Sequence, residues 1–242
     1  RPLPQFEQMV ALRASQNRLI STSKKETTLS EKDLHPEGVT FLPRKGLWLA
    51  GSIRKSKIVS FDLKTGKCTD WLDTDYAVFS MVPDASEKYL WVATSAVDEM
   101  DNYDRKTMEG KCEILKVNIK TKKIEYRYSV GGKHVYGDLL VARNGVVYIS
   151  DSYNPVMYKI EDDSMVPWFR VTDRTCSFQG ICFNEDETSI FVADYLNGIA
   201  EIDVADPSDR QWLTFPEGTI GKGIDGLLWH NKCHIAIYKG VK

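Results

Sequence analysis

Short apolar runs separated by turn residues recur along most of the chain. Residues 137–160 form the clearest unit, in which three apolar or alternating runs are separated by the turns Asn144-Gly145 and Tyr153-Asn154-Pro155. Apolar and polar residues that alternate with a period of two between turn residues predict β-strands. Each unit is therefore expected to form a small antiparallel sheet.

The same order of runs and turns returns at four other places in the chain. These units occupy residues 36–63, 79–95, 178–204 and 223–238, and they follow one another at intervals of roughly 40 to 60 residues. Repeats of about this length, made only of short strands, are typical of β-propellers. We therefore expect an all-β fold, a single β-propeller with four-stranded antiparallel blades. The last unit shows only two strands, so the final blade is expected to be incomplete in this chain.

Two segments depart from the repeat. Residues 1–34 precede a propeller that we assign to 35–242, and the spacing of apolar residues over 4–17 predicts a short helix outside the ring. We expect residues 18–30 to contain an outer strand that pairs with the last blade, because joining the two ends closes a ring of blades. The polar insertion at 95–111 is either a flap over one face or a plain solvated loop.

Composition excludes some classes of protein. The formal net charge of -2 argues against a nucleic-acid groove, which needs a basic stripe. No apolar run approaches the roughly 18 residues of a membrane span. The chain begins with Arg1 rather than methionine, from which we expect a periplasmic or secreted protein, with a cytoplasmic one as the alternative. The five cysteines form no C-x-x-C pair and are expected to be buried thiols, although a bridge between Cys68 and Cys112 is an alternative.

A polar residue occupies the same place in the first strand of every unit. In a propeller this strand follows the central channel, so these residues should converge on the axis. Carboxylates crowded there repel one another unless a cation with oxygen ligands neutralises them; Ca²⁺ or Mg²⁺ suits such a site, and Zn²⁺ is a less usual choice. Alternatively, the acids hydrogen-bond to strand amides or face a water-filled channel. The five residues are Glu37, Ser80, Asp138, Gln179 and Asp225.

The motifs around three of these positions carry a family resemblance. HPEGVTF with Glu37, FQGICFNEDETSIFVADYLNG with Gln179, and GIDGLLW with Asp225 resemble the metal-bearing signatures of the gluconolactonase, regucalcin and senescence-marker-protein family. The resemblance implies a six-bladed propeller in which Glu37, Gln179 and Asp225 hold one divalent ion. Gln179 stands where that family has Asn, and Gly137 replaces a second family Asn.

The resemblance also implies a reaction, the hydrolysis of a lactone ring. The ion would polarise the carbonyl, and Asp225 or Asp138 would accept a proton from the attacking water. His134 could instead be the base or bind a sugar hydroxyl; the alternative is a loop histidine bonded to backbone. Asp151 and Asp194 match each other in position and are expected to cap turns.

Three functions follow from these observations. The first is a metal-dependent hydrolase of small lactones or sugar-acid esters, with Ca²⁺ as the preferred ion. The second is a non-catalytic propeller that binds a protein or a small ligand at the same mouth, and the third is a metal-free scaffold. No G-x-S-x-G, H-E-x-x-H, phosphate-loop or dinucleotide motif occurs in the sequence.

Overall fold

The computed structural model describes residues 4–16 and 22–238 of the chain. These residues form four four-stranded sheets and one two-stranded sheet, with two helices outside them. The helices are α1 (Pro4–Gln16) and α2 (Arg105–Met108). The sheets consist of β1 (Pro36–Leu42), β2 (Leu47–Ser52), β3 (Lys57–Phe61) and β4 (Cys68–Asp73); β5 (Ala77–Pro83), β6 (Tyr89–Ser95), β7 (Cys112–Asn118) and β8 (Lys123–Tyr128); β9 (Tyr136–Val141), β10 (Val147–Asp151), β11 (Val156–Glu161) and β12 (Ser164–Arg170); β13 (Phe178–Phe183), β14 (Ser189–Asp194), β15 (Gly198–Asp203) and β16 (Arg210–Trp212); and β17 (Ile224–His230) and β18 (Cys233–Tyr238).

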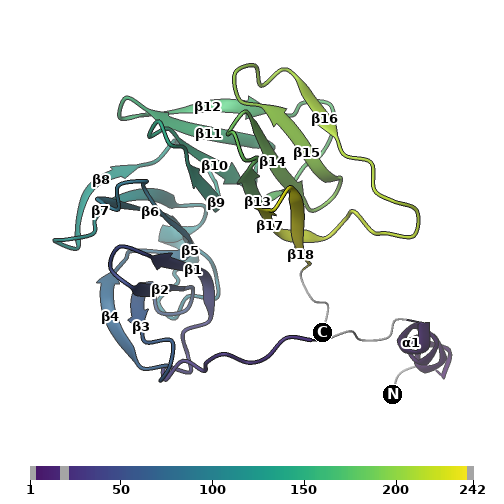
Figure 1. The fold of residues 1–242 in the computed structure, drawn as a ribbon, viewed down its shortest axis with the longest axis horizontal. Coiled ribbons are helices and arrows are strands. Elements are labelled where there is room, and N and C mark those ends of the chain that lie inside the picture. The colour runs from purple at the N-terminus through teal and green to yellow at the C-terminus, as the bar shows by residue number, and fades with distance from the viewer. Residues whose placement is uncertain (1–3, 17–21, 239–242) are drawn as a thin grey trace.

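The sheets are the blades of a β-propeller. Within each sheet the strands are antiparallel and neighbour one another in chain order, and the first strand of each sheet contacts the first strand of the next. The blades follow one another around an arc, with these first strands toward its inside (Figure 1). The predicted all-β propeller is therefore confirmed, and among the described residues the last sheet has two strands, as the sequence predicted.

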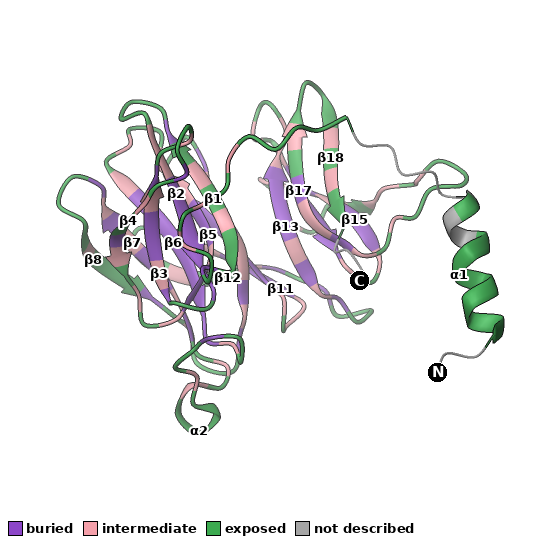
Figure 2. Cartoon of the chain, turned by 90° about the horizontal axis from the view of Figure 1, so that it is seen from below, coloured by how far each residue is buried: buried purple, intermediate pink, exposed green. Residues whose placement is uncertain are grey.

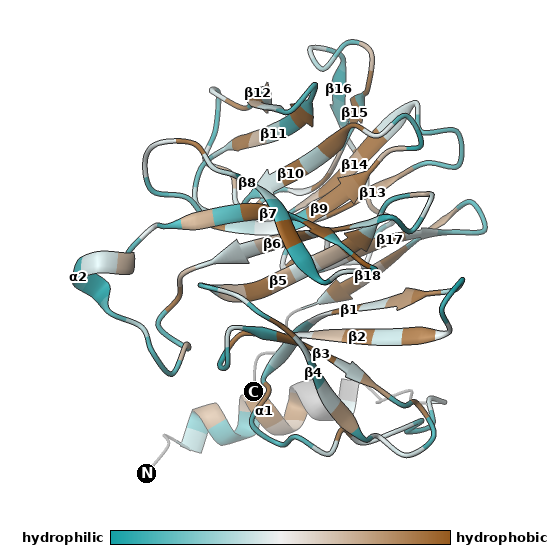
Figure 3. Ribbon diagram, turned by 90° about the vertical axis from the view of Figure 1, so that its left-hand side faces the viewer, coloured by the Kyte–Doolittle hydropathy of each residue, from teal (hydrophilic) through white to brown (hydrophobic). Residues whose placement is uncertain are grey.

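The hydrophobic core lies between the faces of consecutive blades. Phe169 and Met157 of the third blade pack against Phe178 and Ile181 of the fourth. All five residues of β10 are buried, because blades on both sides cover this strand. Burial accordingly follows the middle of the sheets (Figure 2), and apolar residues gather in the strands rather than in the turns between them (Figure 3).

A repeated arginine contact joins neighbouring blades at the turn after the first strand. The backbone N–H of Arg44 donates to the Glu87 carboxylate at 3.0 Å, and its guanidinium donates to a carbonyl of the same turn. Two blades later, Arg143 N–H donates to Glu187 at 2.9 Å, and its guanidinium again reaches a turn carbonyl. The repeat therefore extends to polar contacts between blades.

Glycines let the innermost strands approach one another closely. A Cβ on Gly38 would lie 2.8 Å from the carbonyl oxygen of Phe79, and a Cβ on Gly180 would lie 2.5 Å from the backbone nitrogen of Leu227. Real Cβ atoms essentially never come this close to backbone atoms. Only glycine therefore permits the observed spacing at these two positions.

The amino-terminal segment differs from the prediction of a closing strand. In the described part of that stretch, residues 22–30 form no strand; residues 18–21 lie outside the described residues. Ser30 instead contacts the turn before β4, where its N–H donates to the Gly66 carbonyl at 2.8 Å and its hydroxyl accepts from Cys68 N–H at 3.0 Å. These contacts attach the segment to the first blade, because the turn at Gly66 presents backbone groups that Ser30 can satisfy.

The predicted short helix is present as α1. It lies apart from the blades (Figure 1), and its side chains Phe6, Met9, Val10 and Leu12 are exposed. No helix among the described residues has both the length and the apolar character needed to span a bilayer.

The cysteine predictions are confirmed in part. All five thiols are free, so Cys68 and Cys112 form no bridge. Burial raises the pKa of Cys112, Cys176 and Cys182, each to about 12. Two cysteines depart from the expectation of buried thiols: Cys68 is half-buried, and Cys233 is exposed on β18. Cys233 is exposed because the two-stranded sheet has no further strands beside it within the described residues.

Replacing Gly180 by alanine should destabilise the propeller, because the new Cβ would meet the Leu227 backbone at 2.5 Å. We expect Gly180→Ala to lower the free energy of unfolding by about 2–3 kcal/mol, measured by urea denaturation. Gly131→Ala is the matched control: its Cβ would meet nothing within 4 Å, and its effect should stay within about 0.5 kcal/mol. Equal effects of the two substitutions would contradict the close approach of the strands.

Candidate functional site

A β-bulge occurs at the same level of every inner strand. In each blade the pairing of the first strand with the second shifts register once. Each shift spans or adjoins one of the polar residues that the sequence analysis predicted to face the channel. Bulges redirect side chains and are common next to functional sites. The shifts lie between Pro36 and Val39, Val78 and Ser80, Tyr136 and Leu139, Phe178 and Ile181, and Ile224 and Gly226.

Asp138 joins three consecutive inner strands. Its Oδ1 accepts from the Ser80 hydroxyl on β5 at 2.7 Å and from Leu139 N–H on its own strand at 2.9 Å. Its Oδ2 accepts from Ile181 N–H on β13, also at 2.9 Å. Burial raises the pKa of Asp138 above its ordinary value, and these hydrogen bonds oppose the rise. Both oxygens are already engaged within the protein.

The three predicted metal ligands lie on three inner strands of the arc. Glu37 is exposed on β1, and Asp225 is half-buried on β17 at the other end of the row. Gln179 lies between them on β13, next to β17, and its amide nitrogen donates to the Ser177 hydroxyl at 2.9 Å. No group of three His, Cys, Asp or Glu side chains in residues 4–16 and 22–238 is placed to hold a metal ion. The metal site therefore stays a prediction.

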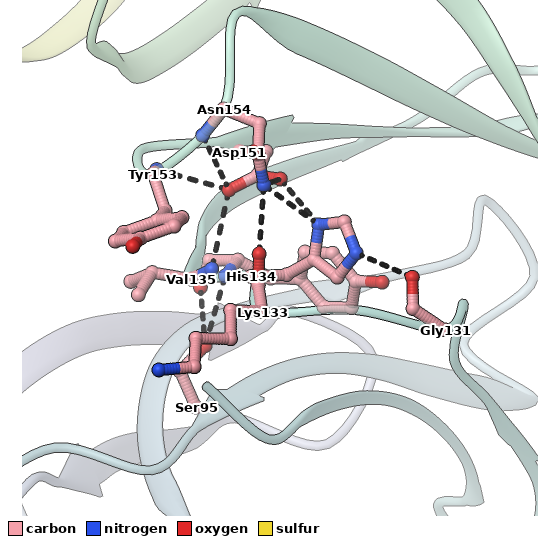
Figure 4. Close-up of polar contacts among 9 residues, drawn as sticks. Ser95, Gly131, Lys133, His134, Val135, Asp151, Tyr153 and Asn154 are labelled. Atoms are coloured by element: carbon pink, nitrogen blue, oxygen red, sulfur yellow. Dashed lines mark hydrogen bonds and ion pairs between the residues drawn. The ribbon is translucent and has the colours of Figure 1, made fainter. Parts of the chain in front are cut away.

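His134 forms a buried pair with Asp151. Its Nδ1 lies 2.7 Å from Asp151 Oδ2, and its Nε2 lies 3.0 Å from the Gly131 carbonyl oxygen. Figure 4 shows the ring held between these two acceptors, with Asn154 above. The histidine side chain is only 9% exposed. Its two ring nitrogens thus contact the protein, as in the loop-histidine alternative.

Asp151 organises the turn that follows the second strand of its blade. Its Oδ1 accepts from the N–H groups of Val135, Tyr153 and Asn154, and its Oδ2 accepts from the Asn154 side chain at 2.9 Å. The carboxylate therefore fixes both the loop before β9 and the turn that carries Tyr153, as Figure 4 shows.

The fourth blade repeats this arrangement around Asp194. Its Oδ1 accepts from Ser177 N–H and Leu196 N–H, and its Oδ2 accepts from the Asn197 side chain at 2.8 Å. Cys176 takes the place that His134 has in the third blade. The predicted turn-capping roles of Asp151 and Asp194 are confirmed, and the signal in the sequence was the repeated D-x-x-N.

The insertion between β6 and β7, residues 96–111, bridges two other blades. Its Asp101 pairs with Lys55 of the first blade at 2.7 Å. Its Glu109 pairs with Lys133, which precedes the third blade, at 3.2 Å, and the Gly110 carbonyl accepts from His134 N–H at 3.0 Å. The predicted flap thus lies on the face where the inner strands begin, held at both ends.

A pocket of about 400 Å³ lies between the insertion and the third blade. We call it the mouth pocket. Its walls combine apolar and aromatic side chains with four charged ones, and the Asp151 turn supplies Tyr153 on one side. The lining residues are Ala96, Val97, Asp98, Tyr103, Arg105, Glu109, Gly110, Lys133, His134, Val135 and Tyr153. Of these, sequence reasoning identified His134 and the insertion as a whole.

A second pocket, of about 320 Å³, lies at the opposite ends of the second and third blades. Its wall includes Trp91 and Lys116, and the Lys116 ammonium lies 4.9 to 5.2 Å from the ring centroids of Tyr89, Trp91 and Tyr126. It also lies 3.7 Å from Asp163. Trp91, the aromatic residue of this lining, thus already contacts a cation of the protein itself.

Residues 52–198 match the protein family described as DUF5128: 6-bladed beta-propeller. No curated protein matches the chain.

Three solved structures share the fold at low sequence identity. Virginiamycin B lyase from Staphylococcus aureus aligns with a TM-score of 0.67 and 16% identity, over 88% of this chain and 67% of the lyase chain. A chain of a nidogen/laminin complex aligns with a TM-score of 0.63 and 13% identity, over 85% and 73% of the two chains. The Cps50 (Swd1) β-propeller domain of Myceliophteria thermophila aligns with a TM-score of 0.59 and 11% identity, over 89% of this chain and 67% of that domain's chain. These likenesses extend to the fold alone.

Asp138→Asn should weaken the junction of the inner strands, because an amide NH₂ would face a backbone N–H in place of an acceptor. We expect a loss of about 1–3 kcal/mol in unfolding free energy at pH 4. The pKa of Asp138 in the folded protein is raised from 3.8. The stability that its protonated carboxyl contributes is therefore complete below pH 3.8 and is lost as the pH rises through the folded pKa. The deficit of the variant should therefore shrink toward pH 7.

Denaturant titrations of both proteins from pH 3 to 8 measure this difference. Asp98→Asn, at an exposed carboxylate, is the control and should change stability by less than about 0.5 kcal/mol at every pH. A deficit that grows as pH rises would contradict the raised pKa.

Proposed function

Because this chain belongs to the DUF5128 family of six-bladed β-propellers, we propose that it is a ligand-binding propeller that takes a small organic molecule in the mouth pocket. The observation that supports this function is the pocket itself, about 400 Å³ in volume. This lies within the range of about 300–1,000 Å³ that is common for small-molecule sites. The blade-two insertion forms one wall and the loop before the third blade forms the other.

The walls of the mouth pocket are held in place before a ligand arrives. Asp151 fixes the turn that presents Tyr153, and the Gly110 carbonyl accepts from His134 N–H across the pocket. Asp101 attaches the insertion to the first blade. A preformed site loses less conformational freedom when a ligand binds, which favours affinity.

Binding also accounts for the polar groups without requiring a reaction. His134 is engaged at both ring nitrogens, and Asp138 accepts three hydrogen bonds. A histidine base needs one ring nitrogen free of such contacts before it takes a proton from water. Tyr153, with 62% of its surface exposed, offers an aromatic face to a ligand without any rearrangement.

Tyr153→Ala tests the proposed pocket with benzyl alcohol as a neutral probe. We expect the wild-type protein to bind benzyl alcohol, and the variant to bind it about two- to tenfold more weakly, because a stacking ring contributes about 0.5–1.5 kcal/mol. Chemical-shift titration by NMR measures the affinity and locates the probe.

Tyr126→Ala is the matched control, since Tyr126 is a comparably exposed tyrosine, on strand β8. It should leave the affinity unchanged. Shifts that avoid residues 96–110 and 133–135, or equal losses in both variants, would remove the support for the mouth pocket.

Metal-dependent lactone hydrolysis is the second candidate, and the repeated bulge favours it. The bulges lie at one level of the inner strands β1, β13 and β17, which carry Glu37, Gln179 and Asp225, the residues that the gluconolactonase resemblance implies as ligands. Oxygen donors of this kind would suit Ca²⁺, which would supply Lewis-acid activation of a carbonyl. The donor set is incomplete among the described residues, where no three acidic or imidazole side chains converge.

Glu37→Gln and Asp225→Asn test this candidate. If Ca²⁺ is held there, each variant should contain at least about tenfold less calcium by elemental analysis, and glucono-δ-lactone hydrolysis should fall with it and stop with a chelator. Glu185→Gln, at an exposed carboxylate on the turn between β13 and β14, is the control. Unchanged metal content and turnover in both variants would exclude the hydrolase.

A further inference from the structure

We infer that the ligand of the mouth pocket is an organic anion, a carboxylate attached to an apolar or aromatic body. This inference rests on the proposed binding function. The carboxylate would lie between Arg105 and Lys133, and its apolar body would lie against Tyr103 and Tyr153.

The two cations of the pocket share one acid. Arg105 lies 3.8 Å from Glu109, and Lys133 lies 3.2 Å from the other oxygen of the same carboxylate. Two positive groups therefore converge on a single negative one. Asp98 brings the four charged lining residues to zero net charge, but at Glu109 two cations contact one acid, an arrangement that suits a second carboxylate.

The contacts of Glu109 are weak enough to be exchanged. The side chains of Arg105, Lys133 and Glu109 are 81%, 54% and 42% exposed, and water and salt screen ion pairs of this kind. Removing Glu109 from either cation therefore costs little. A ligand whose apolar body covers the pocket would exclude water from its own carboxylate, and its contacts with the two cations would be screened less.

The other acids near the pocket form no ion pair with these two cations among the described residues. Asp98 lines the wall but forms no ion pair within 4 Å among the residues that the structure describes. Asp101 is occupied by Arg54 and Lys55 of the first blade. The Asp104 carboxylate accepts from Lys106 N–H at the start of α2. Glu109 is thus the acid that contacts the two cations.

The apolar part of the pocket sets the shape of the ligand. Ala96, Val97, Tyr103 and Tyr153 line it, and Tyr103 also packs into a hydrophobic cluster with Ala96 and Val97. The backbone of Tyr153 is held by its hydrogen bond to Asp151. Two tyrosine rings beside short apolar side chains suit a single ring better than a long chain.

Three probes of one shape test the charge preference. Benzoate, benzyl alcohol and benzylamine carry a negative, a neutral and a positive group on the same ring. We expect benzoate to bind about five- to tenfold more tightly than benzyl alcohol, and benzylamine to bind most weakly, in NMR titrations of the full chain at low salt. Raising the salt concentration should weaken benzoate binding and leave benzyl alcohol unchanged.

Two substitutions should shift benzoate affinity in opposite directions. Glu109→Gln frees the cations and should strengthen binding about two- to fivefold, whereas Lys133→Gln should weaken it by a similar factor. Neither should alter benzyl alcohol binding. Lys123→Gln, at an exposed lysine on β8, should affect none of the probes. All three positions are exposed, so the folding of each variant can be confirmed by its unchanged melting temperature.

The outcomes separate this inference from the function on which it rests. If none of the probes binds in the pocket, the proposed binding function fails. If benzyl alcohol binds there but benzylamine binds more tightly than benzoate, or if Glu109→Gln weakens benzoate binding, the pocket stands and the anion preference is overturned.

Discussion

The close approach of neighbouring inner strands is the constraint on which the rest of this structure depends. Each blade packs its face against the next, and the strands nearest the axis come so close that Gly38 and Gly180 leave no room for a Cβ. At the same level Asp138 accepts hydrogen bonds from a serine of the preceding blade and from a backbone amide of the following blade. Steric fit and polar contacts therefore both stabilise the places where the blades meet. The packing of the blades in turn sets the positions of the turns that line the mouth pocket.

Much of the fold could be predicted from the sequence because each blade repeats the same local pattern. The alternation over 137–160 and its copies located the strands, and the shared polar position located the level at which the bulges occur. The matching positions of Asp151 and Asp194 in their blades likewise predicted their turn-capping roles. These features depend on residues that are close in sequence or on a spacing that recurs. A single sequence is therefore enough to predict them.

The parts that could not be predicted depend on contacts between segments without a repeat. Nothing near Ser30 indicates that it contacts the turn at Gly66 rather than the last blade. The sequence identified His134 but not its partner Gly131, because a backbone carbonyl leaves no signature in composition. The mouth pocket is a third case, because it forms only where the insertion contacts both Lys55 and Lys133. The length of the insertion does not predict which blades it contacts.

At the repeated bulge, the hydrogen bonds that pair the strands of a blade are distinct from the side chain that the bulged residue carries. A bulged residue stands outside the regular ladder of its sheet, so the pairing within its own blade does not require a particular side chain there. Glu37, Gln179 and Asp225 differ in charge and length although their blades share one backbone plan. Mutation can therefore exchange acids and amides at these three positions without altering the sheets, whereas Asp138 is constrained by the neighbouring strands that it connects.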